Sequence, residues 1–354
     1  MIVVNYGQDI TKTTYEALAA CDISSYLRLG MNVAIKPNLV VPGPASAGAT
    51  THPEVVEAII YFLKDFGITN ITIIESSWIG DCTKQAFKYC GYEELSQKHD
   101  VPLFDLKSDS YSTVKYGDTA ISICNRALKT DFLINVPVLK AHSQTRLTCA
   151  MKNLKGCIPD SEKRRFHSIG LHKPIAELNM LLKTGYCVVD GICGDLSFEE
   201  GGNPVVSNRI IAGRNPLTVD SFCAELIGRR PNEIGYLSIG KELCLGDFFA
   251  SETELVELNV KNKPLASEIK GTAADKYEGI INEDCACSAC LSALIYALER
   301  VKCSSGVYGE KLSIGQGFLG KCGEGTGIGN CTDGFTRFVP GCPPKATAII
   351  EALL

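Results

Sequence analysis

The sequence lacks the features that would place it in several large classes of protein. Residues 1–7 contain neither the basic segment nor the apolar segment of an export signal, and we expect them to form a β-strand. The longest apolar runs fall well short of the ~20 residues that are needed to span a bilayer. We therefore expect a cytoplasmic protein that does not bind a membrane.

Neither sign of charge predominates in the chain. Charged residues make up 21% of it and the formal net charge is −5, which argues against a nucleic-acid-binding protein and against an acidic disordered tail. The sequence has no P-loop, no Gly-x-Gly-x-x-Gly motif after a strand and no Gly-x-Ser-x-Gly motif. These absences argue against a nucleotide-binding protein and a serine hydrolase.

Between residues 30 and 228 the sequence alternates short apolar runs with helical patterns. The runs predict strands at 31–36, 71–75, 131–139, 186–190 and 209–212, and the helical patterns predict helices at 51–65, 82–90, 174–183 and 215–228. Thr51 and Glu54 have the spacing of a capping box at a helix start. The strands are apolar without alternation, so we expect burial on both faces. The fold class is therefore α/β, with a mixed, largely parallel sheet flanked by helices.

Cysteine is concentrated near the C-terminus, where residues 285–354 hold seven of the 17 cysteines. A disulfide framework is not expected in a reducing cytoplasm, so this local excess indicates a metal centre. We expect residues 1–250 to form an α/β domain with a ligand site at its strand ends. Residues 251–354 should form a linker followed by a small cysteine-rich, cluster-binding region.

The spacing of the C-terminal cysteines favours an iron–sulfur cluster. A Cys-x-x-Cys pair precedes a helix expected at 288–301, a glycine-rich segment follows at 315–329, and the last cysteine is followed by two prolines. Four thiolates are the usual ligands of a [4Fe–4S] cluster. Structural zinc is the alternative, although zinc sites usually pair two Cys-x-x-Cys motifs. The predicted ligands are Cys287, Cys290, Cys331 and Cys342; Cys285 and Cys322 are ordinary thiols or substitutes for one of them.

Polar side chains follow four of the predicted strands. Ligands of open α/β sheets bind beyond the carboxyl ends of the strands. Each such residue alone is more often an ordinary surface side chain, but their coincidence at four strand ends indicates a ligand site. These residues are Lys36 and Asn38, Glu75, Lys140 and His142, and Asp190, with His52 in the first turn of the helix that follows Lys36.

The segment after His142 adds further donors to this predicted site, namely Arg146, Lys152, Asn153 and Lys155. Asp220 lies on an apolar face of the helix expected at 215–228, where a carboxylate needs a partner. That partner is a lysine, a histidine or a metal of the site, or else a structural hydrogen bond to a loop. Because the cations outnumber Glu75, Asp190 and Asp220, we expect a small anionic substrate.

The N-terminal motifs resemble domain-of-unknown-function family 362 over roughly residues 1–230. The motifs, in chain order, are Lys36-Pro-Asn, Thr51-His-Pro, Glu75-Ser, Lys140-x-His142, Lys152-Asn-Leu-Lys-Gly156, Asp190-Gly and Asn215-Pro-Leu-Thr-Val-Asp220. The resemblance implies a shared scaffold and site, and an iron–sulfur region that is commonly ferredoxin-like. This chain departs from the tight ferredoxin run of cysteines. The activity of the family is not generally established, so the resemblance implies no particular reaction.

The leading hypothesis is an iron–sulfur oxidoreductase that exchanges electrons with a small anion and with a redox partner protein. The catalytic candidates bind the anion, move protons or orient these groups, with an additional divalent metal left open. One alternative is a non-catalytic electron carrier or cluster-binding module, and another is a non-redox, metal-dependent enzyme with a structural cluster or zinc. The catalytic candidates are Lys36, His52, Glu75, Lys140, His142, Asp190 and Asp220; the substrate-binding candidates are Asn38, Arg146, Lys152, Asn153 and Lys155.

Overall fold

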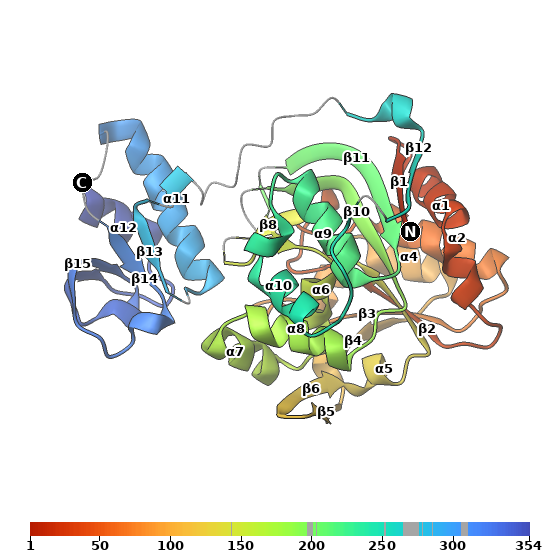
Figure 1. Ribbon diagram of the computed structural model, residues 1–354, viewed down its shortest axis with the longest axis horizontal. Coiled ribbons are helices and arrows are strands. Elements are labelled where there is room, and N and C mark those ends of the chain that lie inside the picture. The colour runs from red at the N-terminus through yellow and green to blue at the C-terminus, as the bar shows by residue number, and fades with distance from the viewer. Residues whose placement is uncertain are drawn as a thin grey trace.

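The chain forms a larger and a smaller lobe (Figure 1). The N-terminus lies in the larger lobe and the C-terminus in the smaller one, which is coloured blue in Figure 1. The computed structural model describes residues 1–142, 144–196, 201–202, 204–250, 253–264, 276–277, 279–284, 286–305 and 311–354.

An eight-stranded sheet forms the centre of the larger lobe. β11 runs antiparallel to both of its neighbours, and the other neighbouring pairs are parallel. The predicted fold class, α/β with a mixed and largely parallel sheet, is confirmed. In spatial order the strands are β12 (Leu255–Leu258), β1 (Ile2–Tyr6), β11 (Pro204–Gly213), β10 (Tyr186–Asp195), β7 (Phe132–Val136), β2 (Val33–Pro37), β3 (Ile71–Glu75) and β4 (Leu103–Asp105).

The sheet separates two hydrophobic cores, because successive side chains of a strand point to opposite faces. On β2, Ala34 enters one core, whereas Val33 and Ile35 enter the other. On β7, Leu133 and Ile134 divide in the same way. Burial on both faces explains why these strands are continuous apolar runs in the sequence.

Helices cover both faces of this sheet (Figure 1). One core is closed by α1 (Ile10–Ala20), α2 (Pro53–Asp65), α3 (Thr83–Tyr89) and α4 (Tyr92–His99). The other is closed by α5 (Asn125–Leu128), α6 (Ala150–Asn153), α7 (Asp160–Ile169), α8 (His172–Leu181), α9 (Pro216–Leu226) and α10 (Gly235–Glu242). The helices predicted from the sequence are confirmed, with ends that differ by a few residues.

Two antiparallel hairpins complete the larger lobe. One pairs β5 (Tyr111–Tyr116) with β6 (Thr119–Cys124), and the other pairs β8 (Lys140–His142) with β9 (Arg146–Thr148). The strand predicted at 131–139 is therefore too long, since β7 ends at Val136 and a single bridge, Val138 to Asp190, follows it. Lys140 begins a separate strand instead of ending the central one.

The smaller lobe has its own parallel sheet and its own core. Its order is β13 (Ile281–Glu283), β14 (Leu312–Ile314), β15 (Gly323–Ile328) and β16 (Phe335–Val339), with helices α11 (Ser288–Ser305) and α12 (Ala346–Leu353). α11 begins at the predicted residue. Throughout the described ranges, none of the helices combines the length and the apolar character that a membrane crossing requires.

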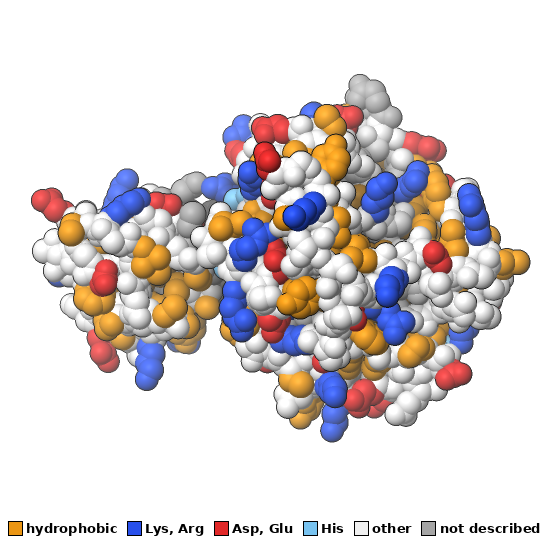
Figure 2. Space-filling model, turned by 90° about the horizontal axis from the view of Figure 1, so that it is seen from below, with side chains coloured by type: hydrophobic (Ala, Val, Ile, Leu, Met, Phe, Trp, Pro, Cys, Tyr) orange, Lys and Arg blue, Asp and Glu red, His pale blue; other side chains and the backbone are white. Residues whose placement is uncertain are grey.

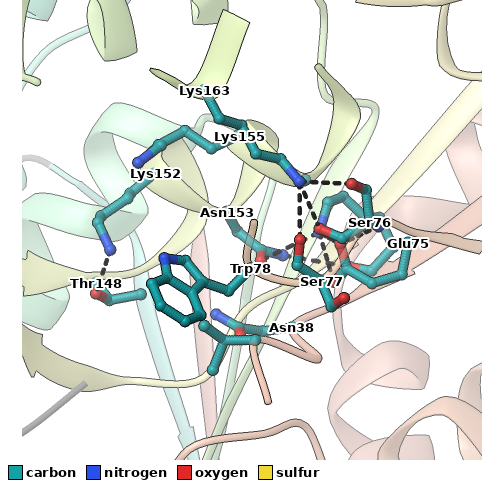
Figure 3. A pocket seen from close by; sticks show the side chains of 13 residues that line it. Asn38, Glu75, Ser76, Ser77, Trp78, Thr148, Lys152, Asn153, Lys155 and Lys163 are labelled. Carbon is teal, nitrogen blue, oxygen red and sulfur yellow. Dashed lines mark hydrogen bonds and ion pairs between the residues drawn. The ribbon is translucent and has the colours of Figure 1, made fainter. Parts of the chain in front are cut away.

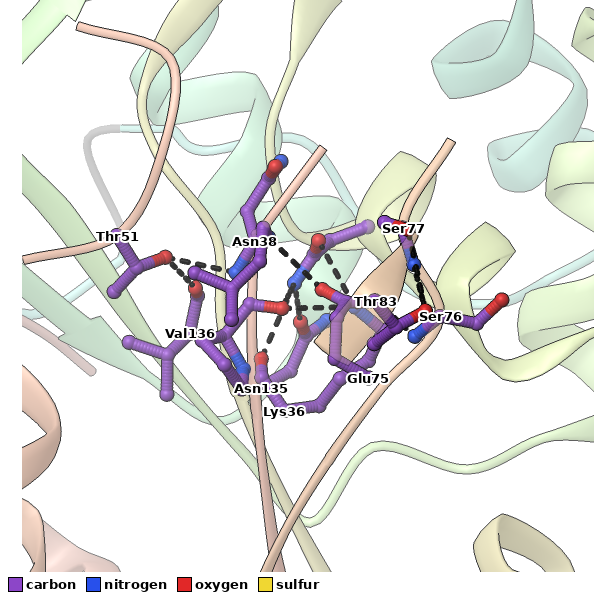
Figure 4. Close-up of polar contacts among 12 residues, drawn as sticks. Lys36, Asn38, Thr51, Glu75, Ser76, Ser77, Thr83, Asn135 and Val136 are labelled. Atoms are coloured by element: carbon purple, nitrogen blue, oxygen red, sulfur yellow. Dashed lines mark hydrogen bonds and ion pairs between the residues drawn. The ribbon is translucent and has the colours of Figure 1, made fainter. Parts of the chain in front are cut away.

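The capping box predicted for Thr51 is wrong. α2 begins at Pro53, its N-cap is His52, and no side chain caps it. The Thr51 hydroxyl instead accepts a hydrogen bond from the backbone N of Asn38 at 2.8 Å and donates to the carbonyl of Val136 at 2.8 Å. Thr51 therefore joins the chain after β2 to the end of β7 (Figure 4).

We predict that Thr51→Val lowers the free energy of unfolding by about 1–3 kcal/mol, because it leaves a buried N–H and a buried carbonyl unpaired. Thr51→Ser keeps the hydroxyl and is the matched control. Denaturant unfolding of both variants checks the prediction. Equal stabilities of Thr51→Val and Thr51→Ser would contradict it.

Candidate functional site

A small cavity lies at the carboxyl ends of β2 and β3, and we call it the inner cavity (Figure 3). Its volume is about 80 Å³. The adjacent parallel strands bring the chain after each of them to the same edge of the sheet. The cavity is lined by Lys36, Asn38, Val40, Glu75, Ser76, Ser77, Trp78, Thr148, Lys152, Asn153, Lys155, Gly156 and Lys163.

A buried ion pair between Lys36 and Glu75 forms the floor of this site (Figure 4). The Lys36 Nζ atom lies 2.9 and 3.0 Å from the two carboxylate oxygens. It also donates to the carbonyl of Pro37 at 2.8 Å and to the Asn153 side-chain oxygen at 3.3 Å. A buried charge is tolerated when it is paired and hydrogen-bonded in this way.

Glu75 also orders the chain around it. Its carboxylate accepts hydrogen bonds from the backbone N of Leu39 at 3.0 Å and of Ser76 at 2.7 Å. Asn153 extends the network to the next strand, because its amide nitrogen donates to the Asn135 side-chain oxygen on β7 at 2.8 Å. The three predicted residues Lys36, Glu75 and Asn153 therefore form one network that fixes the strand ends.

Three more lysines surround the inner cavity. Lys152 on α6 donates to the Thr148 hydroxyl at 3.1 Å, and Lys155 lies 3.2 Å from the His167 Nε2 atom. Lys163 on α7 donates to the carbonyls of residues 76 and 77, at 3.1 and 2.8 Å. Burial lowers the pKa of Lys163, and the charge of Asp160 opposes that shift. Four lysines and one carboxylate line the cavity, so its charge balance is positive.

His52 and Asp190 form a second group that does not line the inner cavity. The His52 Nδ1 atom lies 2.8 Å from an Asp190 carboxylate oxygen, which also accepts from the His52 backbone N at 2.7 Å. Burial lowers the pKa of His52, but the Asp190 charge and hydrogen bond outweigh it and leave that pKa raised. This pair joins the start of α2 to β10.

The residues of the β8–β9 hairpin also lie apart from the lining of the inner cavity. Lys140 is buried and donates to the carbonyl of Ala49 at 2.7 Å. The Nδ1 atom of His142 accepts from the backbone N of Gln144 and Thr145, at 3.1 and 3.0 Å. Arg146 has a positive φ of 64° in the same hairpin. These residues lie away from the end of β7 because the chain there enters the separate β8–β9 hairpin.

Asp220 makes structural hydrogen bonds, as one of the sequence alternatives had it, but to the start of a helix instead of a loop. Its carboxylate accepts from the backbone N of Ala150 at 2.7 Å and of Met151 at 2.9 Å. Burial raises the pKa of Asp220 to about 7, although these hydrogen bonds oppose the shift. Asp220 therefore holds α6, the helix that carries Lys152 and Asn153, without lining the cavity.

The four predicted cluster cysteines lie near one another in the smaller lobe. The pKa of Cys290 is raised, first because its thiol is hydrogen-bonded to Cys287 and next by burial. The charges of Cys342 and Cys331 raise it further. The pKa of Cys331 is raised by burial and by the charges of Cys287 and Cys342.

The chain around Cys331 and Cys342 is held by two hydrogen bonds. The backbone N of Asn330 donates to the carbonyl of Gly341 at 3.0 Å, and the backbone N of Gly341 donates to the Asn330 side chain at 2.6 Å. Gly341 has a φ of 135°, which only glycine adopts readily. The glycine beside Cys342 is therefore required by the backbone.

Cys287 lies at the start of α11 and faces the larger lobe. Its sulfur accepts from the Gln316 amide nitrogen at 3.0 Å, and the same nitrogen lies 3.2 Å from the carbonyl of His167. Hydrogen bonds from Cys290 and Gln316 lower the pKa of Cys287 to about 6, against the effect of burial. Gln316 thus joins a predicted ligand to α7.

Four thiols beside a glycine-rich segment are the donor types that a [4Fe–4S] cluster uses. Within the described ranges, no three His, Cys, Asp or Glu side chains are grouped to hold a metal ion. Cys322 is exposed, and Cys285 lies outside the described residues.

A larger cavity of about 460 Å³ lies between the inner cavity and Cys287, and we call it the outer cavity. Val40, Trp78 and Lys155 line both cavities. Figure 2 shows basic side chains on the larger lobe beside the waist where the two lobes meet. The outer cavity, which is partly open to solvent, therefore lies between the strand-end site and Cys287.

Sequence reasoning missed Trp78 and Thr148 as lining residues. Trp78 is the only tryptophan of the chain and comes directly after Glu75-Ser76-Ser77, which was an available signal. Thr148 is the last residue of β9, and its hydroxyl accepts a hydrogen bond from Lys152 on the following helix, α6. Lys163 belongs to the basic stretch 163–165, whose positive charge alone does not predict that it lies at the cavity.

We predict that Gly156→Ala destabilises the protein by about 1–3 kcal/mol or more, because the added methyl group overlaps Lys36 and Glu75. Gly43→Ala is the control, since its methyl group meets no atom within 4 Å. Thermal unfolding of the two variants checks this. A Gly156→Ala protein as stable as Gly43→Ala would show that the ion pair tolerates displacement.

The Asp220 carboxyl predicts a pH dependence of stability. Its pKa is about 7 in the folded state, against an ordinary value of 3.8, so the folded state binds the proton more tightly. The resulting stabilisation is present below pH ~4 and is lost as the pH rises to ~7. The melting temperature of the wild type should therefore fall relative to that of Asp220→Asn as the pH is raised over this range. A constant difference would contradict the assignment.

Two known proteins are similar to parts of this chain. The thylakoid-associated protein sll1697 of Synechocystis sp. is 25% identical over 247 residues, which is 68% of each chain. The lactate racemase apoprotein of Thermoanaerobacterium thermosaccharolyticum superimposes with a TM-score of 0.43 and 12% identity. That match covers 63% of this chain and 56% of the racemase chain.

The family model for a domain of unknown function, DUF362, matches residues 33–225. The match covers more than half of the chain and includes β2, β3, β7 and β10, together with the lysines of the inner cavity. The resemblance seen in the sequence motifs is confirmed, and this chain belongs to the DUF362 family.

Proposed function

We propose that this protein is an iron–sulfur oxidoreductase that acts on a small anionic substrate at the carboxyl ends of the strands. The observation that carries the proposal is the connection between the two cavities. Trp78 and Lys155 belong to the lysine-lined inner cavity and also to the space that reaches Cys287. A substrate at the strand ends would then lie on the side of the lobe that faces the cysteines.

The inner cavity has the charge and size for a small anionic group. Its volume of about 80 Å³ allows a few water molecules or one carboxylate or phosphate group. Lys152 and Lys155 would bind that group, because both line the cavity. The Lys155–His167 contact at 3.2 Å would hold a proton beside the bound anion.

The cysteine region would hold the redox group. Cys287, Cys290, Cys331 and Cys342 are the residues that would bind a [4Fe–4S] cluster, which supplies one-electron transfer when it is bound. Electrons would be exchanged with a one-electron carrier protein. Gln316 would position Cys287, since it hydrogen-bonds that sulfur and the backbone of α7.

A recessed outer cavity of about 460 Å³ beside the lysines supports an enzyme over a non-catalytic electron carrier, for which a flat edge would be expected. The four candidates for a metal-dependent, non-redox site each bind a different group in the described part of the chain, which is not the arrangement of a shared metal site. His52 binds Asp190, Glu75 binds Lys36, His142 binds the hairpin backbone, and Asp220 binds α6.

We predict that anaerobically purified protein contains about four irons and four sulfides per chain, with a broad brown absorbance that is lost on reduction. Cys342→Ala should lose most of the iron and the absorbance. Cys322→Ala is the matched control and should keep both, because Cys322 is exposed and is not among the charges that act on Cys290. Metal, sulfide and visible-absorbance measurements check this.

Two results would overturn the cluster assignment. One zinc per chain with no sulfide would make the cysteine region a structural site. Full iron in Cys342→Ala would remove Cys342 from the ligand set.

A further inference from the structure

The two connected cavities differ in size and in lining. The inner cavity, at about 80 Å³, is lined mainly by lysines and other polar residues and has no room for the body of a ligand. The outer cavity, at about 460 Å³, is within the range of ordinary small-molecule sites, roughly 300–1,000 Å³. A ligand that uses both must therefore be small and charged at one end and larger at the other.

The wall nearest the inner cavity is apolar and carries the only tryptophan of the chain. Val40, Val41, Trp78 and Ile79 form this wall, and half of the Trp78 surface is exposed. In Figure 3 the Trp78 ring lies beside the lysine side chains of the inner cavity. An exposed, flat aromatic surface favours stacking with a flat ligand group.

Basic side chains line both cavities. Lys155 lines both, and Arg164 and His167 line the outer one, with Asp81 as an opposing charge. The far wall is formed by Cys287, Ala289 and Gln316 of the smaller lobe. A bound anion would thus be anchored by its charged end and would direct its apolar body along Trp78 toward Cys287.

We propose that the ligand of this site is an aromatic acid, with its anionic group in the inner cavity and its ring against Trp78 in the outer cavity. The inference rests on the proposed function and narrows its substrate class from small anions to anions with a flat apolar body. It assigns the outer cavity, the space between the two lobes, as the binding site for that body. Trp78 is then the residue that distinguishes an aromatic acid from a simple one.

The test compares phenylacetate, acetate and uncharged phenylacetamide as probes of the full-length, anaerobically purified protein. Trp78 is the only tryptophan, so intrinsic tryptophan fluorescence reports binding at this wall, and calorimetry measures the affinities. Phenylacetate should bind at least about tenfold more tightly than acetate, because the transfer of an aromatic ring from water into a cavity is favourable enough to raise the affinity by at least that factor. Phenylacetamide should bind more weakly than phenylacetate.

Matched variants separate the contributions of the two ends. Lys155→Met should weaken binding of phenylacetate and acetate alike, whereas Lys183→Met, a change of an exposed lysine before β10, should leave both unchanged. Trp78→Ala should remove the preference for phenylacetate and leave acetate binding intact. Trp78→Phe should restore most of the preference. The iron content of each variant confirms that the cysteine region is unaffected.

The outcomes distinguish this inference from the proposed function. Equal affinities for phenylacetate and acetate would overturn the aromatic body and leave the small-anion site standing. Equal affinities for phenylacetate and phenylacetamide would overturn the anionic anchor, and with it both proposals. Failure of both acids to bind protein with full iron content would likewise overturn both.

Discussion

The buried ion pair between Lys36 and Glu75 is the interaction on which the candidate site depends. Two charges removed from water are stable only if each keeps close partners, and here Lys36 contacts a carboxylate, a carbonyl and the Asn153 amide. Glu75 in turn fixes the chain that leaves β2 and the chain that leaves β3. The ion pair therefore positions the two chain segments that line the cavity after β2 and β3.

The same constraint explains why few of the charged residues are available to a ligand. Glu75 is occupied by Lys36, Asp190 by His52, and Asp220 by the start of α6. Each of these pairings joins segments that are distant in the sequence. Four lysines and one carboxylate line the cavity, so a ligand meets a positive cavity in a chain with a net charge of −5.

Much of the fold could be predicted from the sequence, because the strand and helix periods are strong in this chain. Lys36, Asn38, Glu75, Lys152, Asn153 and Lys155 were predicted as site residues and line one cavity. His52, Lys140, His142, Arg146, Asp190 and Asp220 were grouped with them but lie outside that lining. Most of them were grouped with the site because they lie near a strand end, and Asp220 because it lies on an apolar helix face. The β8–β9 hairpin, the His52–Asp190 pair and the start of α6 place these side chains outside the cavity lining.

The sequence by itself determined the α/β class, the positions of the main elements, the family motifs and the four cysteines, because local periodicity and spacing carry that information. Only the tertiary structure decided which polar residues meet. Thr51 and Asp220 bind backbone groups of distant segments; Thr51 does not cap its own helix, and Asp220 does not line the cavity. Trp78 became a cavity wall because α7 and the smaller lobe pack beside it, and contacts between distant segments leave no pattern in the local sequence.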